Sequence, residues 1–261
     1  MPAMEKIKIL LSDPQVLFRE GMHFTLSAEE DLEVTGETTN NEEALAFVEA
    51  DPPHIVILNI RNGEMDGTAA TRQIKRNFPS VAVIMVVDKE EEELLFAAVK
   101  CGARAYLSKD SSPDYLLDLI RVVAQGSQPI IESLMVPSLA SRILKEFEVL
   151  SPLSEQLRNV LARLSIRESE ILGSIAVGNS LEQIAVSLNC NEGTIRKHLR
   201  SVLNKLVANE QTRAVIDVAK RGLPSLAPGV DLTAEYVTRK EFNEFKESLM
   251  QSFKSLTRES S

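Results

Sequence analysis

The sequence predicts two fold classes in one chain: an α/β domain built on a parallel sheet, followed by an all-helical domain. The first half alternates short apolar runs with amphipathic helical patterns, and strands separated by single helices form parallel sheets covered on both faces. The second half contains four helix-start signals within about sixty residues. The five expected strands are Ile7 to Leu11, Leu32 to Gly36, Ile55 to Leu58, Val81 to Val87 and Ala105 to Leu107.

Length and charge agree with this division. The chain has 261 residues, enough for two domains that each bury a core. Residues 1–125 contain 12 Lys and Arg against 22 Asp and Glu, whereas residues 164–224 contain 8 against 6. The acidic half is therefore not the part that would bind nucleic acid. Because the positive excess of the second half is small, we expect two copies to act together on DNA.

Several functional classes are not expected. Cys101 and Cys190 are far apart and have no neighbouring metal ligands, which argues against a disulfide framework or a metal site. No signal-peptide pattern occurs, and no apolar run approaches the roughly 20 residues of a membrane span. The sequence contains no nucleophile–base pair and no glycine-rich phosphate loop with a recognisable spacing. We expect a cytoplasmic protein without cofactor or enzymatic activity.

The four helices of the second half are predicted from their ends. Ser/Thr/Asn residues that precede an apolar pattern can accept a hydrogen bond from the first turn, and a Glu or Gln three positions later completes a capping box. Gly178 and Gly222 follow the first and last patterns, as C-terminal caps do. The expected helix starts are Ser165 with Glu168, Ser180 with Gln183, Asn191, and Asn209.

The third of these helices, over residues 191–206, has an apolar face and a cationic face. Arg196, Arg200 and Asn204 repeat every four residues, with Lys197 beside them. Such a helix can enter a major groove, where its cations meet phosphates and guanine edges. The alternative is the solvated surface of an ordinary helical bundle. The apolar face consists of Ile195, Leu199, Val202 and Leu206.

The whole segment resembles the LuxR-type helix-turn-helix. The resemblance lies in "LSIRESEILGSIAVGNSLEQIAVSLNCNEGTIRKHLRSVLNKL", followed by "TRAVIDVAKRGL". It implies sequence-specific binding to double-stranded DNA. Glu182 stands where the family usually has a lysine, so one phosphate contact is lost. The DNA contacts that the resemblance implies fall on Thr194, Arg196, Lys197, Arg200 and Lys205.

The first half resembles the receiver domain of NarL/FixJ-type response regulators, a flavodoxin-like doubly wound fold. The strings "KIKILLSDPQVLFREGM", "HIVILNIRNGEMDGTAATRQIK" and "GARAYLSKDSSPDYLLDLIRVVAQG" carry the resemblance. In that family an aspartate after the third strand accepts a phosphoryl group, and two acids after the first strand hold Mg²⁺. A hydroxyl after the fourth strand and a lysine after the fifth contact the phosphate. All these groups lie at the carboxyl ends of the strands.

This chain departs from the receiver pattern at three of those five positions. Asp13 and Lys109 match the second acid and the lysine. Ser12 replaces the first acid, Asn59 the phosphoacceptor and Val87 the hydroxyl. A carboxamide has no anionic oxygen to attack a phosphoryl donor, and one remaining carboxylate is a poor ligand set for Mg²⁺. We therefore predict an atypical receiver that does not use phosphorylation. The loop Asn62-Gly63-Glu64 also differs from the Met-Pro-Gly that is usual in the family. Asp88 is either a displaced carboxylate or a solvated residue at the end of a strand.

A surface for dimers or partners is expected on the fourth and fifth helices and the strand between them, as in related receivers. Its residues are Leu94, Leu95, Ala98, Tyr106, Leu116 and Leu117. A ligand in the altered strand-end pocket is a weaker alternative.

The predicted domain order is a receiver-like domain at 5–126, a helical linker at 127–163, the DNA-binding domain at 164–224 and a C-terminal bridge and helix at 225–261. Two linker helices are expected, one with Leu139, Ile143, Leu144 and Phe147 and one with Leu157, Val160, Leu161 and Leu164. Self-association, packing onto its own domain, and docking of another protein all remain open for the C-terminal helix. Its apolar stripe is Phe242, Phe245, Leu249, Phe253 and Leu256.

The sequence thus favours a dimeric, phosphorylation-independent transcription regulator that binds DNA, with RNA polymerase or a sensor protein as further possible partners. One alternative is a two-component regulator phosphorylated at a non-standard site. Another is a protein-interaction module with little DNA specificity, which the low positive charge of residues 164–224 permits.

Overall fold

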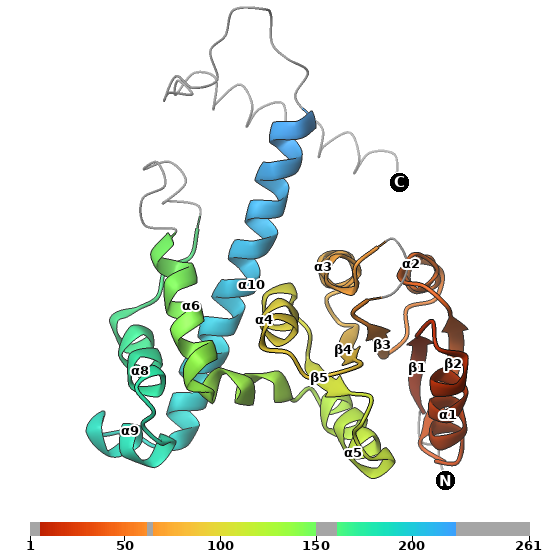
Figure 1. The fold of residues 1–261 in the computed structure, drawn as a ribbon, viewed down its shortest axis with the longest axis horizontal. Coiled ribbons are helices and arrows are strands. Elements are labelled where there is room, and N and C mark those ends of the chain that lie inside the picture. Colours follow the sequence, from red (N-terminus) through yellow and green to blue (C-terminus); the bar gives the residue numbers. More distant parts are fainter. Residues whose placement is uncertain (1–5, 62–64, 150–160, 223–261) are drawn as a thin grey trace, which may run out of the picture. The chain divides into compact units, whose positions relative to one another are not determined.

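The structure is a computed structural model that describes residues 6–61, 65–149 and 161–222. By its contacts the chain divides into two compact units, residues 1–216 and residues 217–261. The first unit contains the sheet and the helices described below, apart from the C-terminal end of the last helix (Figure 1). No helix among the described residues is long and apolar enough to cross a membrane.

The first half folds into a five-stranded parallel sheet with the order β2-β1-β3-β4-β5. All five predicted strands are confirmed to within a few residues. Single helices connect consecutive strands, as the alternating pattern predicted. The elements are β1 (Ile7–Ser12), α1 (Val16–Ser27), β2 (Leu32–Thr38), α2 (Asn41–Ala50), β3 (Ile55–Asn59), α3 (Gly67–Asn77), β4 (Ala82–Val87), α4 (Glu92–Cys101), β5 (Ala105–Ser108) and α5 (Pro113–Ala124).

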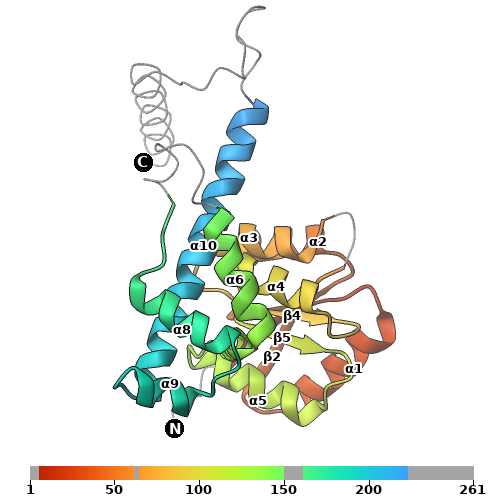
Figure 2. The same cartoon turned by 60° about the vertical axis from the view of Figure 1, so that its left-hand side comes forward.

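Helices cover both faces of this sheet, because successive side chains of a strand point to opposite sides. Ile9 and Leu11 of β1 pack in one apolar cluster with α1 and α5, whereas Leu10 packs in the other with α2, α3 and α4. The two groups of helices are visible on either side of the strands in Figures 1 and 2. The central strands β3 and β4 are buried along their whole length, which explains their continuous apolar sequence.

A 3-10 helix and an α-helix follow the sheet domain. The α-helix α6 (Pro137–Val149) confirms the first predicted linker helix. The 3-10 helix η1 (Pro129–Met135), which the sequence pattern did not predict, is tied to the sheet because the Ile130 N–H donates to the Arg104 carbonyl at 3.0 Å. Residues 150–160 lie outside the described part, and residues 161–164 are not helical, so the second linker helix does not extend to Leu164 as predicted.

The helical domain contains α8 (Ile166–Ala176), α9 (Leu181–Ser187) and α10 (Glu192–Gly222). Both predicted capping boxes are present, at Ser165 with Glu168 and at Ser180 with Gln183. Gly178 has a φ of 90°, the left-handed conformation that a glycine after a helix end adopts most easily.

The predicted fourth helix start at Asn209 is wrong, because α10 continues through this position to Gly222. The side chain of Asn209 is buried and its amide is used elsewhere. Its Oδ1 accepts from the Ala162 N–H at 2.7 Å and its Nδ2 donates to the Ala162 carbonyl at 2.9 Å. Since neither Gly nor Pro interrupts the surrounding sequence, nothing stops the helix there. Asn209 thus anchors the segment before α8 instead of capping a new helix.

Candidate functional site

The carboxyl ends of β1, β3 and β5 bring together three of the predicted pocket residues, Asp13, Asn59 and Lys109. The Asn59 side chain is oriented by its two neighbours: Nδ2 donates to Asp13 Oδ2 at 2.8 Å, and Oδ1 accepts from the Arg61 N–H at 2.9 Å. The Lys109 ammonium lies 2.8 Å from Asp13 Oδ2 and 3.1 Å from Oδ1. Asp13 also accepts from the Gln15 N–H at 2.8 Å. The Asp13 carboxylate is therefore engaged on both oxygens.

The other two predicted pocket positions, Ser12 and Val87, have different surroundings. Ser12 donates to the Asn40 carbonyl at 3.0 Å. Val87 is fully buried in the apolar cluster beneath α2, α3 and α4. Asp88, the alternative acid, is 59% exposed and lies 3.0 Å from the Lys109 ammonium. Lys109 thus bridges one buried and one exposed carboxylate.

Two supporting residues of this pocket were not predicted. The buried Asn41 donates from Nδ2 to the carbonyls of Asn59 (3.3 Å) and Met65 (3.0 Å), which ties both residues to α2. Arg19 of α1 donates to the Asp13 carbonyl at 2.7 Å. Neither Arg19 nor Asn41 is among the five receiver positions named above, so their contacts with the pocket become visible only in the folded structure.

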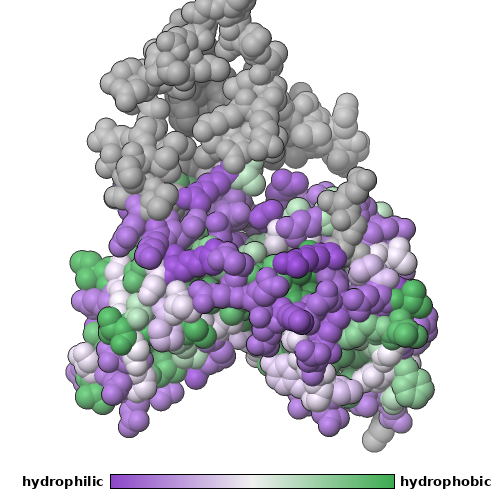
Figure 3. Space-filling model, in the orientation of Figure 1, coloured by the Kyte–Doolittle hydropathy of each residue, from purple (hydrophilic) through white to green (hydrophobic). Residues whose placement is uncertain are grey.

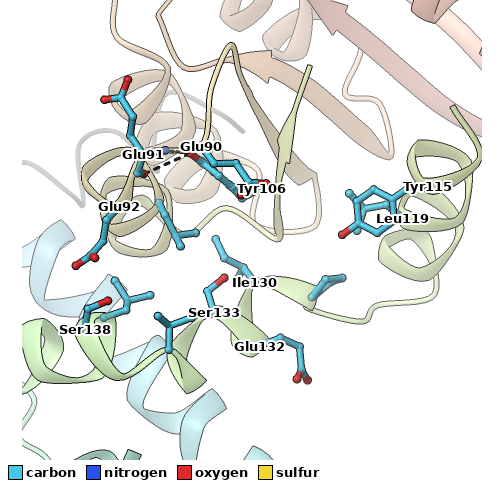
Figure 4. A pocket seen from close by; sticks show the side chains of 14 residues that line it. Glu90, Glu91, Glu92, Tyr106, Tyr115, Leu119, Ile130, Glu132, Ser133 and Ser138 are labelled. Carbon is cyan, nitrogen blue, oxygen red and sulfur yellow. Dashed lines mark hydrogen bonds between the residues drawn. The ribbon is translucent and has the colours of Figure 1, made fainter. Parts of the chain in front are cut away.

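The predicted partner surface on α4 and β5 is partly covered by η1 and α6. A cavity of about 400 Å³ remains there, and four glutamates, Tyr106, Tyr115, Leu95 and residues of η1 are among those that line it (Figure 4). The Tyr106 hydroxyl contacts the Glu91 backbone at 3.4–3.5 Å, and burial raises the pKa of this phenol. Ala98 and Leu116 are buried core residues. The glutamates are Glu90, Glu91, Glu92 and Glu132.

The helix-turn-helix consists of α9, a tight turn and the first half of α10. Asn189 takes the left-handed conformation in the turn, with a φ of 47°, which asparagine tolerates better than most residues. The Cys190 N–H donates to the Ala185 carbonyl at 2.9 Å, and Asn191 Oδ1 accepts from the Thr194 N–H at 2.8 Å. The predicted helix start at Asn191 is thus confirmed.

The five predicted DNA-contacting residues all lie on α10. Lys197 and Arg200 are exposed, and the Thr194 hydroxyl donates to Asn191 at 3.1 Å. Arg196, whose side chain is 42% exposed, forms an ion pair with Glu132 of η1. Lys205 differs from the others because its ammonium lies 2.6 Å from Glu168 of α8.

The pair of Glu168 and Lys205 joins α8 to α10 inside the helical domain. Glu168 is 3% exposed as a side chain. Burial favours its neutral form, but hydrogen bonds from Lys205, the Ser165 N–H and Ser201 outweigh this and lower its pKa to about 2.

Comparison with known proteins identifies both halves. Residues 9–121 match the response regulator receiver domain, and residues 162–218 match the bacterial regulatory proteins of the luxR family. The transcriptional regulatory protein DegU of Brevibacillus brevis is 30% identical over 228 residues, which cover 83% of this chain and 94% of DegU. The chain belongs to the LuxR-type response regulators. It is thus a DNA-binding transcription regulator of this family and not an enzyme.

The chain is also similar to further response regulators. The response regulator protein VraR of Staphylococcus aureus is 30% identical over 210 residues, which cover 80% of this chain and 95% of VraR. Among solved structures, the signal receiver domain of the response regulator NarL from Mycobacterium tuberculosis is 27% identical, with a TM-score of 0.46 over 47% of this chain and 98% of that domain.

Replacing Glu168 by Gln should destabilise this LuxR-type domain by about 1–3 kcal/mol near neutral pH, because Lys205 loses its buried partner. The folded-state pKa of Glu168 lies below the ordinary value of 4.5, so the stabilisation is complete above pH 4.5 and is lost as the pH falls toward 2. Thermal unfolding followed by circular dichroism should show a gap between wild type and variant that closes over this range. Glu182→Gln, at an exposed glutamate of α9, is the matched control. A gap that is unchanged at pH 2 would contradict this assignment.

Proposed function

We propose that this regulator controls transcription without phosphorylation of its receiver domain, acting as a dimer that places two copies of α10 on DNA. The observation that carries the proposal is the arrangement around Asp13. A hydrogen bond from Asn59 and an ion pair with Lys109, each 2.8 Å long, already engage the carboxylate of Asp13. No incoming phosphoryl group is needed to complete it.

The residues of this pocket do not provide the oxygen ligands that Mg²⁺ requires. Mg²⁺ prefers an octahedral set of oxygens that includes carboxylates. Asp13 contributes one carboxylate, which is neutralised by Lys109, and Ser12 donates to a backbone carbonyl. Asn59 presents its Nδ2 to Asp13, and an amide N–H repels a cation. The donor set therefore favours the internal contacts over a bound metal.

The DNA-binding part of the proposal rests on Thr194, Arg196, Lys197 and Arg200. Arginine can bind phosphate or a guanine edge with two parallel hydrogen bonds, whereas lysine acts as a point charge on phosphate. Lys205 contributes less, because its ammonium neutralises Glu168. To reach DNA, Arg196 must exchange its ion pair with Glu132 for a contact with the duplex.

Dimerisation is the third part. A single helical domain with a small positive excess binds DNA weakly, so two linked copies would be needed. The stripe of Phe242, Phe245, Leu249, Phe253 and Leu256 that we propose for self-association lies outside the described residues.

Phosphorylation at Asp88 is the second candidate function, favoured by the exposure of this carboxylate beside Lys109. It would make the chain a two-component regulator with a displaced acceptor.

Incubation with acetyl phosphate and Mg²⁺ should give no phosphoryl adduct in the intact mass of the protein, because Asn59 offers no nucleophilic oxygen. A receiver that has aspartate at this position, treated in parallel, should gain one phosphoryl group. An adduct on this chain that disappears in Asp88→Asn would establish the second candidate and overturn the first.

Arg196→Ala and Arg200→Ala should each weaken binding to a cognate site by about 1–3 kcal/mol, the usual value of a bidentate base contact. The site would first be selected from genomic fragments, and affinity then measured by fluorescence anisotropy. Lys197→Ala should weaken binding similarly for all sequences and reduce its salt dependence. Arg76→Ala, at an exposed cation of the receiver domain, is the control. Equal affinities for all variants would remove α10 from the interface.

Truncation after Pro228 should lower the mass measured by multi-angle light scattering from dimer to monomer. Phe245→Glu in the full chain should do the same if the stripe forms the contact, since a charge in an apolar interface is strongly unfavourable. A truncated chain that remains dimeric would place the contact elsewhere.

A further inference from the structure

A second cavity, of about 350 Å³, is lined by cationic and amide side chains from several elements. Lys75 lies in the last turn of α3, Arg104 directly precedes β5, and Gln128 directly precedes η1. The opposite wall is one face of α10, whose lining residues recur at helical spacing. These are Arg200, Asn204, Val207, Ala208 and Gln211.

The walls are close together at one end of this cavity. A Cβ atom placed on Gly102, which ends α4 with a φ of 90°, would lie 3.2 Å from Val207 Cγ1. Nearby, Glu210 of α10 pairs with Arg72 and with Lys100, each at 3.1 Å. These contacts hold α10 beside α3 and α4 within the unit of residues 1–216.

Positive charge in the cavity has no matching negative charge. Of the described residues that line it, three are cationic and none is acidic. Glu210, the neighbouring acid, is already shared by two other cations. Burial, and then repulsion from Arg104, lower the pKa of Lys75 to about 8, and no carboxylate contributes to this shift.

The cations are also held in place. The Lys75 ammonium donates to the carbonyls of Pro79 at 2.7 Å and Val81 at 2.8 Å, which leaves one of its three N–H groups for another acceptor. Arg104 donates from one terminal nitrogen to the Gly126 carbonyl at 3.3 Å. Two anchored cations and the exposed Arg200 thus surround a space of the size that small-molecule pockets have.

We propose that this cavity binds a small anion that carries two or more phosphate groups, with Lys75, Arg104 and Arg200 as its ligands. Guanidinium groups form paired, charge-assisted hydrogen bonds with phosphate oxygens, and the amides of Gln128, Asn204 and Gln211 add neutral donors. The phosphates supply the negative charge that the protein lacks at this point. Inorganic polyphosphate and nucleoside polyphosphates share this chemistry, and the size of the cavity admits either.

Occupation of the cavity would oppose DNA binding. Arg200 belongs to the face of α10 proposed to contact DNA, so the anion and a duplex compete for the same guanidinium. Because the anion also contacts Lys75 and Arg104, it would stabilise the arrangement in which α10 lies beside α3. This part of the inference rests on the proposed DNA-binding function, whereas binding of the anion itself does not.

The test is isothermal titration calorimetry of the full chain, without DNA, with tripolyphosphate, ATP and GTP at fixed ionic strength. We expect saturable binding of one anion per chain, and Arg104→Gln should weaken it about tenfold or more, as the loss of charge-assisted hydrogen bonds predicts. Arg76→Gln is the matched control, because Arg76 is an exposed cation of α3 that does not line the cavity. Equal affinity for tripolyphosphate and nucleotides would show that the protein recognises the phosphates alone. Tighter binding of a nucleotide would show that its nucleoside also contacts the protein.

Two outcomes would overturn the proposal. One is that wild type, Arg104→Gln and Arg76→Gln bind the anions with the same affinity, or that none of the three proteins binds an anion. The other is a loss of DNA affinity in Arg104→Gln without any anion present, which would make the cavity a contact for the DNA backbone. The expected result in DNA competition is that the bound anion lowers the DNA affinity of wild type and Arg76→Gln but not of Arg104→Gln. General screening by salt would affect all three equally.

Discussion

The pairing of the buried Asp13 carboxylate with Lys109 and Asn59 is the interaction on which the pocket of the receiver domain depends. A lone carboxylate at the carboxyl ends of parallel strands is costly unless it is paired, and here Lys109 and the Asn59 amide provide the pairing at 2.8 Å each. Asn59 makes further contacts at the end of β3, since its side chain also accepts from the Arg61 N–H and its carbonyl accepts from Asn41. These contacts between protein groups define the geometry of the pocket in the structure.

Much of the fold could be predicted from the sequence because its signals are local. Strand positions follow from apolar runs, and Ser165 and Ser180 mark helix starts through side-chain hydrogen bonds within one turn. Asn209 shows where local reasoning fails. An asparagine before a helical pattern is a good cap, but the side-chain amide of Asn209 forms hydrogen bonds with the backbone of Ala162, 47 residues away. A contact of that range has no signature in the sequence.

The candidate site divides in the same way. The identities of Ser12, Asn59 and Val87 are read directly from the sequence, and our prediction of a receiver that does not use phosphorylation depends on these residue types alone. The supporting contacts of Arg19 and Asn41 and the ion pair of Arg196 with Glu132 depend on which elements meet in space. Lys205 illustrates the difference: its position in the motif suggests a DNA contact, whereas its nearest carboxylate, Glu168, shows that part of its charge stabilises the helical domain.

These arrangements restrict how a signal could reach α10. Under the proposed function the signal does not begin at the strand ends, because Val87 has no hydroxyl to contact a phosphoryl group. Nearby, the Tyr106 hydroxyl contacts the Glu91 backbone at 3.4–3.5 Å. The contacts of α10 with η1 and the receiver domain include ion pairs of Arg196 with Glu132 and of Glu210 with Arg72 and Lys100. Val207 adds an apolar contact near Gly102. Hydrophilic residues form a broad band across the middle of the face shown in Figure 3. Ion pairs near the surface are readily replaced by contacts with a charged ligand, because water solvates both side chains when they separate. Under the two proposals made above, a charged ligand that competes for these contacts would shift α10 between its internal partners and DNA without phosphorylation of the receiver domain.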